Sequence, residues 1–213
     1  MTHSSPRITS RPGAPPRPAA VDGGKGKVNV VAPEELTRWI EERTQLLAQR
    51  WLRELDRRVE GNLEEARSLL EELCPLLVSC LPHLLGPYRS QVEALWQEAA
   101  EFYGNVGSMR GLAAGEAIEE FQLLREVLIR QLYEDPPGDG TQSLGFREVL
   151  RLNRIVDEGV TYAGVGHTDA LFFALFQGTG VARSLTPDLH AEVTDQITAI
   201  RRELDRLTGY LEH

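Results

Sequence analysis

The sequence predicts an all-α protein, and three observations lead to this fold class. Apolar residues recur every three or four positions through successive segments, which is the period of an amphipathic helix. No stretch alternates apolar and polar residues with a period of two, as a half-buried strand would. The breaks between segments are short, which favours antiparallel neighbours. We therefore expect an antiparallel multi-helix bundle, of which a globin-like arrangement is one form, with a coiled-coil-type helix at its C-terminus.

The first predicted helix begins at Pro33, because proline suits the first helical position and Glu34 and Glu35 place negative charge near the positive end of the helix. Its apolar stripe consists of Leu36, Trp39, Ile40, Leu47, Trp51 and Leu55. A capping-box-like restart at Asn62 opens a leucine-rich second helix. Pro75 lies inside this helix and is expected to kink it, since proline removes one backbone hydrogen bond.

Glycine and proline bound the third and fourth predicted helices. The third follows Gly86-Pro87, and Gly104 and Gly107 are expected to loosen its end because glycine is a weak helix former. The fourth begins near Leu112 and ends at the turn 135–138, where two prolines and a glycine stop it.

The fifth predicted helix is the most apolar part of the second half of the chain. It begins near Gly145 and continues, bent at its glycines, through residues 171–176. Residues 163–182 are as long as a membrane span, but His167 and Asp169 interrupt them. We therefore predict a core helix here.

The last predicted helix carries a heptad pattern. It begins near Thr186, which caps it, with Pro187 at its first helical position. Its apolar seam consists of Leu189, Val193, Ile197, Ile200, Leu204 and Leu207. Such a seam packs either against the seam of a second chain, as a dimerisation helix, or against its own domain. The spacing alone does not separate the two, because over three heptads the two periods drift apart by only about 60°.

Composition divides the chain into four parts. Residues 1–32 contain five prolines and no periodic apolar pattern, so we expect a disordered basic tail. Residues 33–183 form the predicted helical domain, and 184–210 the heptad helix. Residues 211–213 read Leu-Glu-His, which is how a vector-derived polyhistidine tag begins, and we expect the natural sequence to belong to a longer protein.

Charge and cysteine content argue against several classes of partner and location. The chain has a net charge of −9, whereas its first 32 residues carry five basic side chains and one acidic, so the remainder carries −13. An acidic body disfavours nucleic acid as the main partner. Cys74 and Cys80 lie in an apolar run, and no secretory segment opens the chain. We expect reduced core thiols, a cytoplasmic protein and no membrane insertion.

The sequence contains no recognisable catalytic or metal-binding motif. It lacks the Glu-x-x-His, His-Glu-x-x-His, Cys-x-x-Cys, Walker and Gly-x-Ser-x-Gly patterns. A haem-binding, globin-like sensor would need a buried axial ligand, for which His83 and His167 are the candidates, although a lone histidine in a helical protein is more often structural. We expect this chain to have no enzymatic activity and no cofactor.

Polar residues at the edge of two apolar faces mark a candidate ligand site. Arg125 follows Phe121 on the buried line of the fourth helix, and Asn153 lies between apolar residues of the fifth. Half-buried polar groups need partners. Here the partners are each other, Asp157 or a ligand, and a purely structural ion pair or hydrogen bond is the simpler interpretation.

Residues 111–125 resemble the N-terminal domain of RsbRD-type co-antagonist proteins. In that family a glycine begins a helix that leads into an acidic-aromatic-x-Leu-Leu-Arg run. The matching positions are Glu120, Phe121, Leu123, Leu124 and Arg125. Weaker similarity at Trp51-Leu52-Arg53 and at Asp157 and Tyr162 extends the resemblance over about residues 35–165.

The resemblance adds Tyr103 and Phe121 to the candidate ligand-binding residues. The family often has a histidine eight residues before the glycine, and Tyr103 holds that place here, so no role of that histidine is carried over. The resemblance implies a non-catalytic, dimeric sensor domain in bacterial stress or two-component signalling. Such domains precede a STAS domain or a histidine kinase core.

Three functions follow as hypotheses. The leading one is the N-terminal sensory and dimerisation domain of a bacterial signalling protein, a histidine kinase in our preferred form, which relays a signal through its last helix. The second is a free-standing helical adaptor that binds a partner protein. The third is a globin-like sensor that binds haem or another small ligand.

Overall fold

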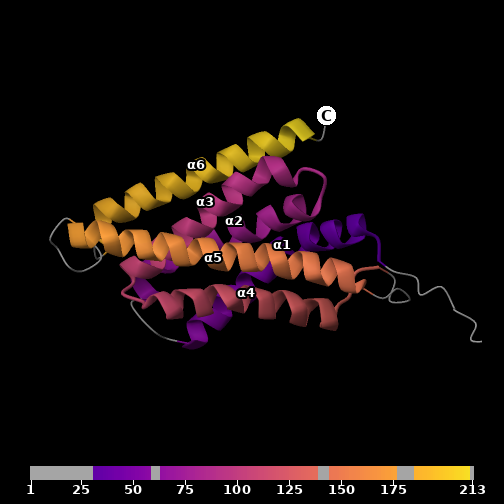
Figure 1. Cartoon of the computed structure of the whole chain (residues 1–213), viewed down its shortest axis with the longest axis horizontal. Helices are drawn as coiled ribbons and strands as arrows, with labels where there is room; N and C mark the ends of the chain where they lie inside the picture. The colour runs from indigo at the N-terminus through magenta and orange to yellow at the C-terminus, as the bar shows by residue number, and fades with distance from the viewer. Residues whose placement is uncertain (1–30, 59–62, 139–143, 177–184, 212–213) are drawn as a thin grey trace, which may run out of the picture.

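The computed structural model folds the chain into a bundle of helices (Figure 1) and describes residues 31–58, 63–138, 144–176 and 185–211. The helices are α1 (Pro33–Arg58), α2 (Leu63–Leu85), α3 (Arg89–Met109), α4 (Ala114–Glu134), α5 (Phe146–Phe176) and α6 (Pro187–Leu211). None of these described residues forms a strand. The predicted all-α fold is therefore confirmed.

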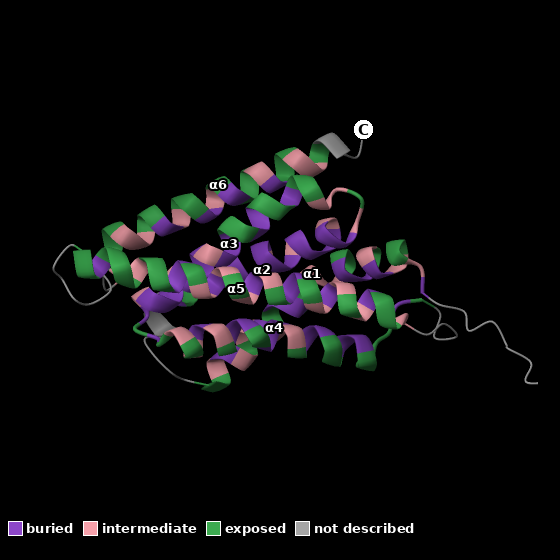
Figure 2. Ribbon diagram, in the orientation of Figure 1, coloured by how far each residue is buried: buried purple, intermediate pink, exposed green. Residues whose placement is uncertain are grey.

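The helices are layered around α2 and α3. α3 and α5 share the most extensive contact, and α1 packs along α2. α4 lies against α5 and α1 on one side of the bundle, and α6 covers α2 and α3 on the other (Figure 1). Buried residues line the inner faces of the helices and exposed residues their outer faces (Figure 2). The arrangement thus satisfies the amphipathic period read from the sequence.

α2 is the most apolar of the described helices and lies among other helices. Its segment Ala66–Leu85 is long and apolar enough, by length and composition alone, to cross a membrane, but 67% of it is buried inside the bundle. α1, α3, α5 and α6 all contact α2, so its apolar side chains are covered by neighbouring helices. The helix continues through Pro75 and Pro82. Cys74 and Cys80 on α2 are buried free thiols, as predicted.

The glycines of α3 allow a backbone contact and do not loosen the helix. α3 continues through Gly104 and Gly107 to Met109, so the predicted loosening at these residues is wrong. A Cβ atom on Gly104 would lie 1.9 Å from the carbonyl oxygen of Ala163, and one on Gly166 would lie 1.9 Å from that of Glu101. The missing side chains therefore let the backbones of α3 and α5 touch.

α5 is one continuous helix, but its last turns do not belong to the core. The prediction of a core helix holds as far as His167, which is 1% exposed. It is wrong for most of the final turns, where the exposed apolar residues are Leu171, Phe172, Phe173, Leu175 and Phe176. The physical reason is that α3 ends at Met109, so α5 extends beyond the helix that covers its earlier turns.

The seam of α6 packs on its own domain. Val193, Ile197, Ile200 and Leu204 are buried in the hydrophobic core, and Leu189 and Leu207 pack against it at partial exposure. Two polar contacts fasten α6 to α2: Ser68 Oγ lies 2.7 Å from His190 Nε2, and Arg201 donates to the Glu72 carbonyl at 2.7 Å. Of the two packings open to the seam, this single chain adopts the one within its own domain.

Several sequence predictions fall outside the described residues. They are the disordered tail (1–30 of its 32 residues), the capping restart at Asn62, and residues 212–213. These remain predictions.

The contact between α3 and α5 predicts opposite effects of alanine at two helical glycines. Gly104→Ala places a methyl group on the backbone of α5, and overpacking of this kind lowers the free energy of unfolding by about 1–3 kcal/mol or more. Gly115→Ala is the control, because a Cβ at Gly115 meets nothing within 4 Å. It is expected to be neutral or to stabilise the protein by up to about 1 kcal/mol. Urea unfolding of both variants measures the difference, and equal free energies would contradict the contact.

Candidate functional site

Two of the predicted ligand-binding residues lie in the middle of the core. Tyr103 of α3 and Phe121 of α4 pack edge to face with ring centroids 5.3 Å apart. Trp51 stacks on Tyr103 at 5.3 Å and meets the edge of Phe121 at 5.5 Å. All three side chains are fully buried, so they form an aromatic core rather than the wall of an open site.

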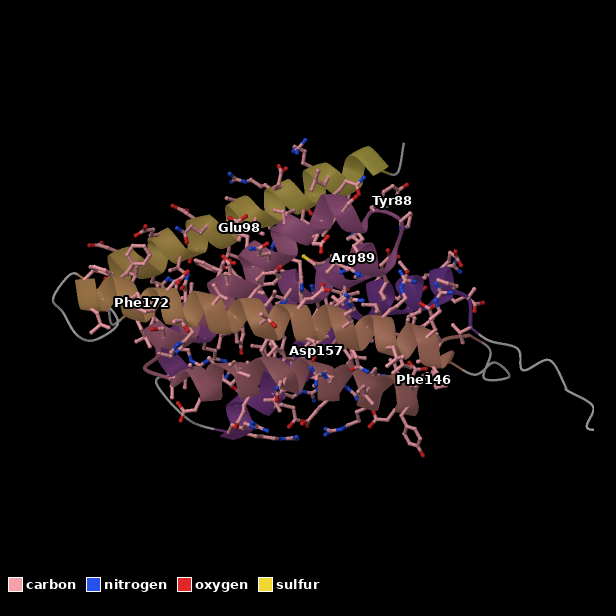
Figure 3. The ribbon with its side chains drawn as sticks, viewed as in Figure 1. Tyr88, Arg89, Glu98, Phe146, Asp157 and Phe172 are labelled. Carbon is pink, nitrogen blue, oxygen red and sulfur yellow. The ribbon has the colours of Figure 1, made fainter. Side chains whose placement is uncertain are left out.

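The other predicted residues lie nearer the surface. Arg125 of α4 forms an ion pair with Asp157 of α5, one of the partnerships that the sequence left open. The Asp157 side chain is 62% exposed and lies at the edge of α5 that faces α4 (Figure 3). Asn153 is half-buried on the same helix. The structure therefore divides the predicted set into a buried aromatic pair and a surface ion pair, and does not bring the five residues into one site.

A buried ion pair that the sequence analysis missed lies beside the aromatic core. The Arg110 guanidinium donates to both carboxylate oxygens of Glu120, at 2.6 and 2.9 Å, and the two side chains are 1% and 6% exposed. The Tyr103 hydroxyl donates to the same carboxylate at 3.2 Å, and the Trp51 indole N–H donates to the Glu120 carbonyl at 2.9 Å. Glu120 therefore ties α1, α3 and α4 together.

One signal in the sequence pointed to this pair. Glu120 lies three residues after Ala117 and four before Leu124, so it falls on the buried line of α4. A charged residue on such a line needs an opposite charge. Which residue supplies it depends on the turn after α3, where Gly111 adopts a φ of 80° and the chain reverses beside Glu120.

Burial and charge shift the pKa values of the groups around Glu120. Burial raises the pKa of the Tyr103 hydroxyl well above its usual value, and the negative charge of Glu120 raises it further. The same two causes, in the same order, raise the pKa of the Cys74 thiol. Burial is the largest influence on Arg110 and lowers its pKa, but the hydrogen bonds to Glu120 and the negative charge of that carboxylate together outweigh burial and raise the pKa. Tyr103 and Cys74 therefore stay neutral and Arg110 stays charged, as a structural cluster requires.

His167 also has a structural contact. Its Nε2 lies 2.7 Å from the Leu112 carbonyl, so Nε2 carries the proton and donates it. This bond fastens α5 to the turn between α3 and α4. The nitrogen that a haem iron would take is thus engaged with the backbone, which favours the structural interpretation of this histidine.

One open site of the molecule lies at the end of α5 and is lined by three helices. We call it the α5 groove, a pocket of about 380 Å³ between α3, the last turns of α5 and the beginning of α6. Phe172 in Figure 3 marks this end of α5, and Phe146 the opposite end. The groove is lined by Glu101, Asn105 and Met109 of α3, Gly166, Asp169, Ala170, Phe173 and Ala174 of α5, and Leu189 and Glu192 of α6.

The α5 groove combines apolar walls with negative charge. Its carboxylates are Glu101, Asp169 and Glu192, and none of the described residues that line it is a lysine or an arginine. Glu101 accepts a hydrogen bond from Gln97 at 3.0 Å, and none of the three carboxylates forms an ion pair with another described residue. The size is within the range of small-ligand and peptide-side-chain pockets. The groove is therefore suited to a cationic group attached to an apolar body.

The described residues offer no grouping of three or more histidine, cysteine or acidic side chains that would hold a metal ion. No protein-family model matches this chain, and no curated protein or solved structure is similar to it. The resemblance of residues 111–125 therefore stays a prediction.

The buried ion pair predicts a large loss of stability when one partner is neutralised. Glu120→Gln leaves the Arg110 charge buried without its counter-charge, so the free energy of unfolding is expected to fall by about 3–5 kcal/mol. Asp157→Asn removes the matched surface pair and is expected to cost about 1 kcal/mol or less. Urea denaturation compares the two. An equal loss of free energy of unfolding in the two variants would mean that burial of the Arg110–Glu120 pair does not affect stability.

The buried thiol of Cys80 predicts a loss of stability at high pH. Burial raises its pKa from 9.0 to about 12, so between these values the folded protein keeps a proton that the unfolded chain releases. The free energy of unfolding therefore falls as the pH rises through this range, by up to about 1.4 kcal/mol per pH unit. Cys80→Ala removes this thiol, so the free energy of unfolding should fall less steeply with pH, by the contribution of one proton. Urea unfolding between pH 8.5 and 10.5 gives both slopes, and parallel slopes would refute the shift.

Proposed function

We propose that this chain is a non-catalytic sensory and dimerisation module of a bacterial signalling protein, which relays the occupancy of the α5 groove through α6. One observation carries the proposal: α6 itself forms one wall of the groove, through Leu189 and Glu192. A ligand there would contact the helical domain and the first turns of α6 at the same time.

α6 has a single apolar stripe. Its seam residues face the core, whereas the outer face of the helix carries exposed residues such as Asp195, Gln196, Arg202 and Arg206. A single apolar stripe can be buried against only one surface at a time. Packing of α6 on α2 and α3 and coiled-coil pairing of α6 with a second chain are therefore mutually exclusive states of the same surface.

The apolar character of α2 makes these two states interdependent. α6 covers α2, so release of α6 would expose leucine side chains of α2 to water, at a cost proportional to the exposed apolar area. Pairing with a second chain would offset this cost by covering the seam and the exposed face together. A module of this kind has two discrete packings, which is what a signalling switch requires.

Occupancy of the α5 groove would shift the balance between the two states. A ligand changes such an equilibrium only by its difference in affinity for them. Because Leu189 and Glu192 line the groove only while α6 is packed on the domain, a ligand that contacts them favours the packed state. A ligand excluded by α6 would favour the released state.

The downstream partner is proposed from the sequence resemblance. A histidine kinase core is our preferred output and a STAS-type effector the second, because a heptad helix joins directly to a dimeric helical core. We also propose that helices consecutive in the sequence pack antiparallel in a globin-like bundle, that the module acts in the cytoplasm, and that it needs no cofactor.

The proposal predicts that α6 opens separately from the rest of the bundle. Ile197→Ala weakens the packing of a fully buried seam residue by about 2–5 kcal/mol. Hydrogen exchange of α6 amides should then accelerate at least about 30-fold, while exchange in α3 and α5 stays unchanged. Sedimentation should show a concentration-dependent dimer in the wild-type chain, in which the seam that Ile197 shares with a second chain is intact. Gln196→Ala, on the exposed face of α6, is the control and should change neither measurement.

Two results would contradict this proposal. One is exchange of α6 at the same rate as α3 and α5 in the wild-type chain, which would mean that α6 opens only when the whole protein unfolds. The other is a monomer at all concentrations in both the wild type and Ile197→Ala.

A further inference from the structure

The apolar surface at the end of α5 continues the α5 groove. Phe173 lies in the groove and is 68% exposed, and Phe172 and Phe176 follow on the neighbouring faces of the helix at 56% and 88%. Single exposed apolar residues are ordinary, but several large ones together mark an interaction surface. We call these three phenylalanines the α5 aromatic end. The groove and this end offer one continuous binding surface.

Charge decides which occupant fits this surface. Glu101, Asp169 and Glu192 line the groove beside the aromatic end, and the part of the lining that the structure describes contains no lysine or arginine. An anionic membrane surface is therefore repelled. A second aromatic end, docked face to face, would bring another set of the same three carboxylates. The occupant must carry positive charge next to groups that pack on aromatic rings.

The chain itself contains a segment with these properties. Residues 11–18 read Arg-Pro-Gly-Ala-Pro-Pro-Arg-Pro, with a cation near each end and four prolines. Proline-rich segments favour the extended polyproline II conformation, which docks on aromatic-lined surfaces at a low entropic cost. Arginine pairs with carboxylates in a two-pronged geometry and stacks on aromatic rings. The first 32 residues carry a net charge of +4 and the rest of the chain −13.

We propose that residues 11–18 of a second copy of this chain bind the α5 groove and its aromatic end, with Arg17 on the carboxylates and the prolines on the phenylalanines. The assignment rests on the proposed function in one respect, the use of the groove as a binding site. It adds the identity of the occupant and makes the basic N-terminal tail part of the assembly.

Reach favours a second copy over the same chain. α1 begins at the end of the bundle where α5 also begins, and the groove lies at the other end of α5 (Figures 1 and 3). α5 has 31 residues and is therefore about 46 Å long. The thirteen steps from Pro18 to Val31 span about 43 Å when fully extended, so the same chain could bring Arg17 to the groove only with its linker almost straight along the bundle. The tail of a second molecule has no such constraint.

A labelled peptide tests the assignment on the intact protein. A fluorescein-labelled peptide of residues 7–20 is titrated with the full chain, and its anisotropy gives the affinity. We expect saturable binding that weakens with salt, and that weakens at least about tenfold in the double variant Asp169→Lys, Glu192→Lys. Phe173→Ala should also weaken it. The double variant Glu41→Lys, Glu126→Lys changes the charge equally at exposed sites away from the groove and should bind as the wild type does.

The second part of the test measures self-association of the intact chain. Sedimentation should show self-association that the double variant Arg11→Glu, Arg17→Glu reduces. Absence of peptide binding, or equal loss in the groove and control variants, would overturn the proposal. Self-association that depends on Phe173 but not on Arg11 and Arg17 would assign the surface to a second aromatic end instead. Hydrogen exchange of α6 tests the proposed function separately. A failure of the peptide to bind can therefore be distinguished from a failure of α6 to open.

Discussion

The structure depends on the place where the backbones of α3 and α5 touch. Gly104 rests on the carbonyl of Ala163, and Gly166 on that of Glu101, at separations that leave no room for a side chain. This contact fixes the lengthwise position of α5 against α3. With that position set, His167 meets the carbonyl of Leu112 and α5 extends past the end of α3. The α5 groove is therefore a consequence of two residues without side chains.

The carboxylate of Glu120 plays the corresponding part for the other helices. It collects hydrogen bonds from Arg110 and Tyr103, while its backbone carbonyl holds Trp51. A buried ion pair is a poor source of net stability, because removing two charges from water costs about as much as their attraction returns. We interpret the cluster as a device for alignment, since only one arrangement of α1, α3 and α4 satisfies all of these donors at once.

The helices could be predicted from the sequence because their signals are local. Pro33 and Pro187 each stand at the first position of a helix, and the stripe that begins with Leu36 and Trp39 is buried as expected. The failures concern which surfaces meet. The sequence does not show whether the glycine at 104 weakens its helix or lets the backbone of another helix approach. The apolar run at 171–176 likewise does not reveal that α3 ends before it.

The candidate site was harder to predict for the same reason. The partnership of Arg125 with Asp157 was among the options, since both lie near the edges of their helices. The pairing of Arg110 with Glu120 was not, because Arg110 lies in a turn whose direction depends on Gly111. The groove joins residues from three separate helices, and Glu101, Asp169 and Glu192 share no spacing that a sequence pattern could register. The seam of α6 gave its buried face correctly, but an apolar stripe carries no information on which molecule covers it.

That α6 has one apolar stripe also constrains how the protein can evolve. In the proposed two-state module, Ile197 and Ile200 must fit the surface of α2 and also their counterparts in another molecule. A substitution at these positions must pack well on both surfaces. Fewer residues are therefore acceptable there than at core positions with a single environment, such as Leu128. Opposite effects on the two surfaces would set the response threshold of the module without altering its fold. Mutations that add or remove a single methyl group in the seam could thus change the sensitivity of the module to its ligand in small steps.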